Sequence, residues 1–537
     1  MVSLLSSLNM TANTLSVNEK AISVVSHNVA NMNTEGYHKQ RVNFATRNIP
    51  GAIGDNVNNQ IRANGGVKIA NVMRYNDAYL SNYYRTQLSE LGKLEQQLDG
   101  LGDLADILND LDGTGIDKAL SNFYEALNNL NEYPASSTAR INFIETAKTL
   151  TSTMNAKYQQ LSENTTQALG DGENEESLKN SKIYVQYGVL NDKLEELAAV
   201  NKALQTTQTG TLEANNLLDR RDLILNDIAK FTNITVEEKD NGSVNVYTGN
   251  VVLVKGAVVK SELKLQTAKA YCESQNPPIG YPEEWQAMGG ENAVVSLVNP
   301  ENGEITVGNA NSVFTSGTLG GLLHFATDMG DGENGINAGT VMNGLNKLCQ
   351  TIADVFNDLN TRNGAYCINP DDTEKLQAAD PANLIFIGAN GDGTGITAGN
   401  IQINPDLLTD EGCWKIACAY FDDPANFDVN AVGNAQNVKE MLGTRNLKQD
   451  ALNGQSIEDF YTGLVGKVAA AGSNIQSLYG TQGDVIDSIE AKLKDATGVD
   501  LNEELVDLVK YQTAYAAAAQ VFNTCNSCLD TLMSLGR

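Results

Sequence analysis

The sequence has few of the residues that catalytic sites use most often. Its 537 residues include 3 histidines, and neither a His-Glu-x-x-His nor a Gly-x-Ser-x-Gly motif occurs. Gly466-Lys467 comes closest to a phosphate-binding loop, but Tyr461 and Val468 stand where that motif requires a glycine and a Ser or Thr. We therefore expect no enzyme, with no catalytic residues and no cofactor.

Metal-binding patterns are also scarce. Of the 7 cysteines, Cys525 and Cys528 form the one Cys-x-x-Cys spacing, with no second pair and no nearby histidine to complete a zinc site. Residues 390–395 resemble the front of a calcium-binding loop, but Ile401 occupies the position that needs a bidentate glutamate. We predict no metal site and interpret the cysteines as small buried residues. One disulfide stays open: Cys367 with either Cys413 or Cys418.

Long apolar runs and clustered positive charge are absent as well. No stretch approaches the ~18 consecutive apolar residues of a membrane-spanning helix. The first 18 residues carry no Lys or Arg, so we expect no cleavable secretory signal. The formal net charge is −29, from 37 basic and 66 acidic residues, which argues against nucleic acid and against an anionic membrane surface as partners.

The sequence does have the same unusual pattern at both ends. Near the N-terminus, apolar residues recur every seven positions: Leu8, Leu15, Ile22 and Val29. Near the C-terminus the same repeat is formed by Leu501, Leu508, Tyr515, Phe522 and Leu529. We predict a second series four residues later, beginning at Leu505. A sustained repeat of this kind predicts coiled-coil helices.

The faces that flank the C-terminal repeat are free of charge. Residues 511–529 contain no Asp, Glu, Lys or Arg, whereas the outer positions of a solvated coiled coil usually carry them. Two interpretations remain: a buried helix of one large domain, or a helix surrounded by other copies of the chain. Ordering a residue costs about 1–2 kcal/mol, and one buried Leu or Phe returns only ~1.5–3 kcal/mol. We therefore favour helices that are marginal in the monomer and stable in an assembly.

Between the ends the periodicity changes twice. Apolar residues at steps of three and four predict helices at residues 76–109, 116–130, 136–167, 175–208 and 211–230. Short β-branched segments separated by turn residues then predict strands at 232–236, 244–247, 251–254, 294–298 and 305–307. Helices return at 319–326, 341–359, 434–442 and 457–497, the last with gaps at 463–466 and 480–483.

This order predicts an α+β protein. The terminal helices would pair as a coiled coil, a long helical-bundle domain would follow, and β-rich outer domains would be inserted at the far end. We expect an axial coiled coil from residues 1–34 with 499–537. The other expected parts are a helical rod domain of residues 35–231 with 318–365 and 434–498, an inserted β domain of 232–317, and a second β-rich segment of 366–433.

A motif after the first predicted helix resembles the N-terminal signature of bacterial flagellar axial proteins, the family of rod, hook and hook-associated proteins. Its matching residues are Asn28, Asn31, Asn33, Thr34, Gly36 and Tyr37. These residues also suit a helix end on physical grounds, because Asn and Thr side chains compete for backbone hydrogen bonds and Gly tolerates positive φ. Residues 501–505 and 511–515 resemble the closing helix of the same family.

Motifs further in resemble the hook-associated members of that family. They follow the same order along the chain, at residues 37–41, 217–222, 244–247, 253–256, 319–323 and 400–405. Lys39 departs from the pattern, where an Arg is usual, and the 7 cysteines are not part of it. The resemblance implies a structural protein at the junction between the flexible hook and the rigid filament.

The resemblance also implies partners and a location. The partners would be copies of the chain in a ring or helical layer, hook protein below, the second junction protein above, and an export chaperone on the C-terminal helix. The protein would be exported by the flagellar type III system to the extracellular flagellum, without membrane insertion. The heptad residues named above, Leu505 included, would form the axial assembly interface.

Two alternatives stay open. Another axial component, such as hook or rod protein, would share the terminal helices but suits residues 218–222 and the long helical block less well. A secreted coiled-coil adhesin would instead have termini that stay folded in the monomer, and a binding surface on residues 232–433.

Overall fold

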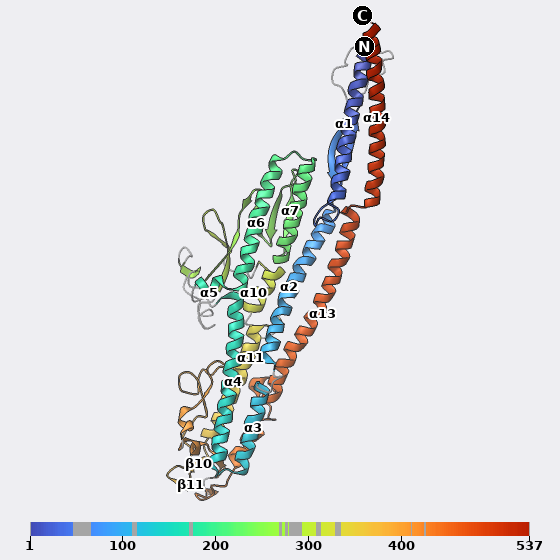
Figure 1. Cartoon of the computed structure of the whole chain (residues 1–537). Coiled ribbons are helices and arrows are strands. Elements are labelled where there is room, and N and C mark those ends of the chain that lie inside the picture. The colour runs from blue at the N-terminus through green and yellow to red at the C-terminus, as the bar shows by residue number, and fades with distance from the viewer. Residues whose placement is uncertain are drawn as a thin grey trace.

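The protein folds as a long rod whose N- and C-termini lie together at one end (Figure 1). The computed structural model describes residues 2–46, 66–109, 115–170, 175–267, 271–273, 278, 293–307, 313–327, 335–409, 411–423 and 426–535. Long helices run the length of the rod, and small antiparallel sheets lie along its side and at its far end (Figure 1). The predicted α+β fold class is confirmed.

A pair of helices forms the end of the rod that carries both termini. α1 (Val2–Ala30) packs along α14 (Leu501–Leu535), so the predicted pairing of the chain ends is confirmed (Figure 1). The antiparallel strands β1 (Gln40–Thr46) and β2 (Val67–Arg74) pack against α1. The sequence patterns do not predict this hairpin.

Two long helices connect the terminal pair to the body of the rod. α2 (Ala78–Leu108) and α13 (Ile457–Thr497) lie side by side and pack against each other (Figure 1). Each begins where a side chain, Asp77 or Ser456, accepts a hydrogen bond from a first-turn N–H. The gaps expected at 463–466 and 480–483 are wrong, because α13 is unbroken. Its packing along α2 offsets a cost of about 1 kcal/mol per glycine.

The far half of the rod holds the larger hydrophobic core. Its main helices are α3 (Ile116–Glu132), α4 (Ser137–Leu169), α11 (Ala338–Thr361) and α12 (Gln436–Gly443). Phe123 is 1% exposed, and its ring centroid lies 5.2 Å from that of Phe143 and 5.1 Å from that of Phe356. The apolar periodicity predicted these helices to within a few residues, since the periodic face is the buried face.

A second core fills the middle of the rod. It forms where α6 (Lys182–Thr206), α7 (Leu212–Phe231) and α10 (Gly317–Thr327) pack with sheets of strand order β3-β4-β5-β6 and β7-β8-β9. Ser181 caps α6 and separates it from α5 (Glu175–Lys179), which divides one predicted helix into two. The strands are β3 (Thr235–Glu238), β4 (Val244–Thr248), β5 (Val251–Lys255), β6 (Val258–Val259), β7 (Glu262–Thr267), β8 (Ala293–Val298) and β9 (Ile305–Val307).

Short strands and turns cover one side of the larger core at the far end of the rod. β10 (Ala365–Asn369) is the central strand of the order β11-β10-β14. The other short elements are β11 (Asp372–Ala378), β12 (Phe386–Ile387), β13 (Gln402–Ile403), β14 (Ala419–Tyr420) and the 3₁₀ helices η2 (Pro405–Leu408), η3 (Gly412–Lys415) and η5 (Asp450–Leu452). Their apolar residues extend the core, so this second β-rich region packs on the helices that precede it.

Candidate functional site

The contact between α1 and α14 is narrow. On α14 the fully buried side chains lie seven residues apart, at Glu504, Tyr511 and Ala518. The second series of the seam therefore follows the first by three residues, and the spacing of four that we predicted from Leu505 is wrong for this contact. A spacing of four would place two polar side chains, Gln512 and Asn526, in the seam. A spacing of three places the Tyr511 ring and the small Ala518 there.

The ten residues predicted to form the axial interface differ in their exposure. Seven are half-buried along the helix pair: Leu8, Leu15, Ile22, Val29, Leu508, Phe522 and Leu529. Three are exposed: Leu501, Leu505 and Tyr515. Because none of the ten is fully buried within one chain, all of them retain surface for further contacts. Their role between copies stays a prediction.

Further apolar side chains on α14 are more exposed than those that the heptad repeat identified. Val506 is 68% exposed, Val509 61% and Val521 49%. For Val521 the sequence signal is the lack of charge in residues 511–529, where a solvated helix would carry Lys and Glu, whereas Val506 and Val509 precede that stretch and have charged neighbours. A row of exposed apolar residues of this kind marks a surface that another protein covers.

Asn28 ties the base of α1 to the start of both β1 and α14. Its amide nitrogen donates to the Gln40 carbonyl at 2.8 Å and to the Glu504 carboxylate at 3.0 Å. Its amide oxygen accepts from the Gln40 N–H at 3.1 Å and from the Tyr37 hydroxyl at 2.7 Å. The side chain thus makes all four hydrogen bonds open to an amide while it is 1% exposed. Segments far apart in the sequence are joined at one residue.

Glu504 is a functional residue that the sequence patterns did not identify. An acidic pair such as Glu503 and Glu504 on a helix is typical of a solvated face, but Glu504 is 2% exposed and accepts the Asn28 hydrogen bond. Lys39 lies 3.6 Å from the Glu504 carboxylate and also pairs with Glu503. The burial of Glu504 depends on Asn28, which lies 476 positions away in the sequence, so no local pattern could predict it.

The rest of the predicted motif forms the turn between α1 and β1. The Asn31 side chain donates to the His27 carbonyl at 2.9 Å, and the Thr34 N–H donates to the Asn31 carbonyl at 2.9 Å, which ends the helix. Gly36 has φ +73°, so its predicted positive φ is confirmed. Burial, with Asp219 and Glu504 nearby, raises the pKa of Tyr37 and keeps its hydroxyl protonated. Asn33 is exposed.

A buried group of charges holds the hairpin, α2 and α7 together next to this turn. Asp222 pairs with Arg74 at 2.7 Å, Arg221 at 2.8 Å and Arg85 at 3.2 Å. Asp219 pairs with Arg74 at 2.7 Å, and its carboxylate lies 2.8 Å from the His38 ring nitrogen. We call this group, residues 38, 74, 85, 219, 221 and 222, the ion-pair hub.

The electrostatics of the ion-pair hub favour the ionised carboxylate. Burial opposes ionisation of Asp222, yet the guanidinium groups of Arg221, Arg74 and Arg85 outweigh it and hold the pKa of Asp222 well below its ordinary range. Residues 217–222 were singled out from the sequence as a family motif, and the aspartates of that motif lie in the hub. Arg74 and Arg85 were not identified, because they lie in separate elements of the sequence.

A cleft of about 710 Å³ opens beside the hub. Its walls come from residues 32–38 of the turn and from α2, α7 and α13, and they include the carboxylates of Glu35, Asp487 and Glu490. The Tyr84 hydroxyl donates to Glu490, and burial together with that carboxylate raises the pKa of Tyr84. Among the described residues, no group of three or more His, Cys, Asp or Glu side chains is arranged to hold a metal ion.

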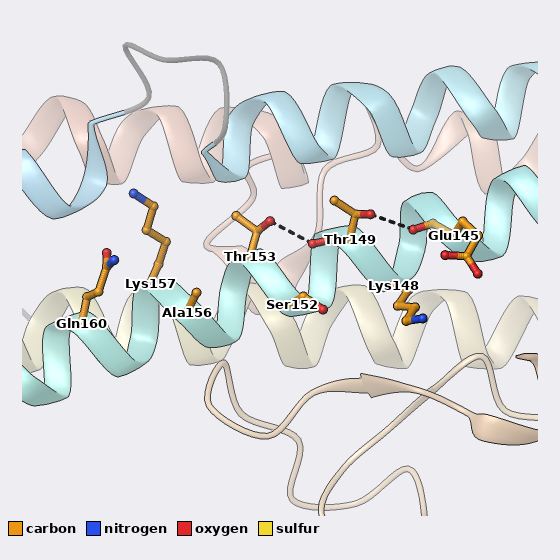
Figure 2. Close-up of a pocket in the computed structure, with 8 residues that line it drawn as sticks. All are labelled: Glu145, Lys148, Thr149, Ser152, Thr153, Ala156, Lys157 and Gln160. Atoms are coloured by element: carbon orange, nitrogen blue, oxygen red, sulfur yellow. Dashed lines mark hydrogen bonds between the residues drawn. The ribbon is translucent and has the colours of Figure 1, made fainter.

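A second hollow, of about 470 Å³, lies along α4 (Figure 2). Its eight lining residues all belong to this one helix, and they mix charged and polar groups. The Thr149 and Thr153 hydroxyls donate to carbonyls one turn back, at 2.9 and 2.8 Å, so they are occupied within the helix (Figure 2). The residues drawn there form an open helix face with no nucleophile and base in contact.

The loop that resembles a calcium site is a set of turns. The Asp392 carboxylate accepts hydrogen bonds from the Thr394 N–H at 3.0 Å and from the Thr394 hydroxyl at 2.7 Å. Ile401, where a calcium loop needs glutamate, is buried in the larger core. The glycines and Asp392 therefore serve the tight turns that precede β13.

Comparison with known proteins covers both terminal helices and the body. The family model described as the flagellar hook-associated protein FlgK helical domain matches residues 101–365. Models described as flagella basal body rod protein and as flagellar basal body rod FlgEFG protein C-terminal match residues 8–38 and 495–535. The chain is 24% identical to flagellar hook-associated protein 1 of Bacillus subtilis over 97% of its own length and 96% of that relative. The chain is similar to the flagellar hook-associated protein 1 family along nearly its whole length.

Further proteins with flagellar hook-associated or hook junction names are similar to this chain. The protein of that name from Escherichia coli is 23% identical, over 98% of this chain and 99% of the relative. The solved structure of the flagellar hook junction protein FlgK from Burkholderia pseudomallei has a TM-score of 0.54 at 14% identity, over 76% of this chain and 99% of that one. The two proteins thus share a fold. None of the described helices is both long enough and apolar enough to cross a membrane.

Proposed function

We propose that this chain is a structural, non-enzymatic protein that self-assembles at the hook-filament junction of the bacterial flagellum and couples the flexible hook to the rigid filament. The observation that carries the proposal is the terminal helix pair, which has a narrow internal seam, exposed apolar side chains on α14 and no charge in residues 511–529. The relatives named flagellar hook-associated protein 1, similar over nearly the whole chain, support the same function. The protein acts outside the cell, in the flagellum.

The terminal helices are the part that assembly would complete. α14 orders 35 residues, and its fully buried side chains are few. Each ordered residue costs about 1–2 kcal/mol, whereas each buried apolar side chain returns only ~1.5–3 kcal/mol. Neighbouring copies that cover Val506, Val509 and Val521 would add the missing burial. The predicted axial interface residues, with these three valines, are our proposed contact between copies.

The joint below the helices would transmit force between the axial pair and the body. The Asn28 hydrogen bonds fix α1 to the start of α14, and the ion-pair hub fixes the hairpin to α2 and α7. Buried polar groups that pair with one another tolerate few geometries, because a displacement leaves a charge or a donor unpaired. We propose that this joint sets the angle at which each subunit meets the junction.

The finer assignments follow the same reasoning and stay proposals. The proposed direct partners are copies of this chain, hook protein below, the second junction protein above, and an export chaperone on the C-terminal helix. We also propose the division into an axial part, residues 1–34 with 499–537, and a helical rod that carries the β-rich segments. Hook or rod protein and a coiled-coil adhesin are not favoured by relatives that match along the full chain.

An assembly assay with matched surface variants tests the proposal. Val509→Asp places a charge on α14 at a side chain that is 61% exposed, and Val185→Asp does the same on α6, also at 61%. Both variants should fold as monomers like the parent chain. We expect Val509→Asp to abolish incorporation into junctions, measured by electron microscopy of hook-filament particles from a strain that lacks the parent protein, while Val185→Asp incorporates normally.

Phe522→Asp is a second variant for the same assay. It should also abolish incorporation while the helical body stays folded, as judged by circular dichroism. Normal incorporation of both Val509→Asp and Phe522→Asp would refute the proposed interface. Limited proteolysis of the monomer separates the adhesin alternative, since an adhesin would resist cleavage at both ends.

A further inference from the structure

Two cysteines face each other across the small sheet at the far end of the rod. β10 and β14 are antiparallel, with Ala365 opposite Tyr420 and Tyr366 opposite Ala419. The ladder ends there, and Cys367 and Cys418 occupy the next position of this register, Cys418 directly before β14. The third candidate from the sequence, Cys413, lies within η3, ahead of Cys418 in the chain, and has no place in this register.

The hydrogen-bond pattern gives the type of this pair. The Phe421 N–H donates to the Gly364 carbonyl at 2.9 Å, so residues 364 and 421 form a hydrogen-bonded pair. Hydrogen-bonded and non-hydrogen-bonded pairs alternate along an antiparallel ladder. Cys367 and Cys418 therefore stand, one step beyond the last pair, where a regular ladder would place a non-hydrogen-bonded pair, with Cα atoms about 4.5 Å apart and the side chains close together. This spacing lies within the range that a disulfide spans.

The surroundings of the pair include a cation with no carboxylate partner. Arg140 of α4 is 0% exposed, and its guanidinium donates to the carbonyls of Pro134, Cys413 and Ile416. Its remaining nitrogen, Nη2, has no hydrogen-bond partner among the described residues. A buried charge without a counter-ion is costly. A thiolate at Cys367 or Cys418 would supply one.

The two thiols respond to this cation. Burial raises the pKa of both Cys367 and Cys418, while the Arg140 charge lowers the pKa of each. The Cys367 thiol is also close enough to Cys418 to raise the pKa of Cys418 further. Arg140 thus favours the thiolate form, which is the form that reacts with disulfides. Both cysteines are thiols in this structure, and they are 1% and 2% exposed.

We propose that Cys367 and Cys418 form a disulfide that fastens β10 to β14 when the chain folds outside the cell. β14 has two residues and meets β10 through two residue pairs, so the covalent bond would secure a short and weakly paired strand. The bond would join the satellite cluster around Ile368 and Ala419 to the larger core, of which Cys418 is a member. Extracellular conditions favour disulfides.

The reaction needs a small-molecule disulfide as oxidant, and oxidised glutathione serves as the probe. The Cys367 thiolate attacks one glutathione sulfur, which breaks the glutathione S–S bond, forms a mixed disulfide and releases one glutathione thiolate. The Cys418 thiolate then attacks the Cys367 sulfur and releases the second glutathione thiolate. The two cysteines are oxidised, one glutathione disulfide is reduced to two thiols, and the cysteine protons pass to the released thiolates.

Peptide mapping of the full-length chain tests the proposal. The chain is unfolded under reducing conditions, refolded with oxidised and reduced glutathione, alkylated in denaturant and digested for mass spectrometry. We expect one linked peptide that contains Cys367 and Cys418, lighter by two hydrogen atoms than the two reduced peptides, and lost on reduction. Cys349, which is buried elsewhere in the same core, should be alkylated in full.

Two variants complete the test. Cys418→Ser should remove the linked peptide and leave Cys367 alkylated, whereas Cys349→Ser should leave the linked peptide unchanged. Reduction should lower the melting temperature of the parent chain but not that of the Cys367→Ser/Cys418→Ser double variant. Full alkylation of both cysteines after oxidative refolding of the parent chain, or a linked peptide that joins Cys367 to Cys413, would overturn the proposal.

Discussion

The terminal helix pair and the bundle around α3 bury very different fractions of their residues. α3 has 17 residues and buries eight of them, Phe123 at the centre. α14 has 35 residues, and its fully buried side chains are Glu504, Tyr511 and Ala518. The longer helix therefore gains far less from the hydrophobic effect within one chain. We infer that α3 belongs to a body that folds alone, and that α14 depends on contacts with other chains.

The charge around each helix points in the same direction. α3 carries Asp117 and Lys118 on faces that water reaches, whereas the stretch of α14 from 511 to 529 has no charged residue although many of its side chains are exposed. An exposed helix face that carries no charged residues is typical of a surface that another protein covers. The contrast separates a region built for water from a region built for assembly.

The largest expected effect is a difference in unfolding free energy between a variant of the body and a variant of the terminal helix pair. Phe123→Ala removes a ring that is 1% exposed, and it should lower the free energy of unfolding of the body by about 3–5 kcal/mol. Phe522→Ala should change that free energy by less than about 0.5 kcal/mol, because its site is a marginal helix pair outside the body. Urea unfolding followed by tryptophan fluorescence measures both, since Trp414 packs against the core of Phe123. Equal losses in the two variants would remove the distinction between the regions.

The next effect concerns the joint between the two regions. Asp222→Asn leaves three arginines without their shared carboxylate, and we expect it to destabilise the protein by about 3–5 kcal/mol at pH 7. The Arg220→Gln variant is a suitable control, because Arg220 pairs with Glu196 on the surface and should cost ~1 kcal/mol or less. A loss from Asp222→Asn no larger than that from Arg220→Gln would contradict the role assigned to the hub.

The same variant has a defined pH dependence. The pKa of Asp222 is lowered in the folded protein, so its stabilising contribution is complete above the ordinary value of 3.8 and is lost as pH falls from there toward the lowered pKa. The difference in unfolding free energy between the parent chain and Asp222→Asn should therefore be constant from pH 7 to about 5 and shrink below 3.8. A difference that already shrinks near pH 6 would assign the effect to another group.

A smaller effect is expected where α1 meets α14. Asn28→Ala removes the hydrogen bonds that Asn28 makes with the Gln40 backbone and the Glu504 carboxylate and should cost about 1–3 kcal/mol locally. Asn33→Ala, at an exposed position of the same motif, should cost less than about 0.5 kcal/mol. Amide hydrogen exchange at residues 38–42 measures the difference. Similar exchange in both variants would show that Asn28 does not hold the joint.

The sequence predicted most of the helices because their burial is periodic. The helix expected at 116–130 is found at Ile116–Glu132, and the strands expected at 244–247 and 251–254 are found as β4 and β5. The hairpin of β1 and β2 escaped prediction although β2 contains Val67, Ile69 and Val72, and its strands are held by tertiary contacts with α1. The continuity of α13 escaped for a similar reason, since glycines that would weaken an isolated helix are held by packing along α2.

The candidate site was predictable in part. The motif from Asn28 to Tyr37 was recognised, and the positive φ of Gly36 followed from its residue type. The partners of the motif were not predictable, because Glu504 is 476 positions from Asn28 and Arg74 is 145 from Asp219. A local pattern identifies a residue that ends a helix, but only the folded chain shows what that residue then holds.

Amide hydrogen exchange of the monomer and of the assembled junction tests the central claim most directly. In the monomer, we expect residues 505–530 of α14 to exchange within seconds, while residues 119–130 of α3 stay protected for hours. In assembled junctions, protection of residues 505–530 should rise to the level of α3. Strong protection of those α14 amides already in the monomer would contradict the account, because the helices would then need no neighbours to become ordered.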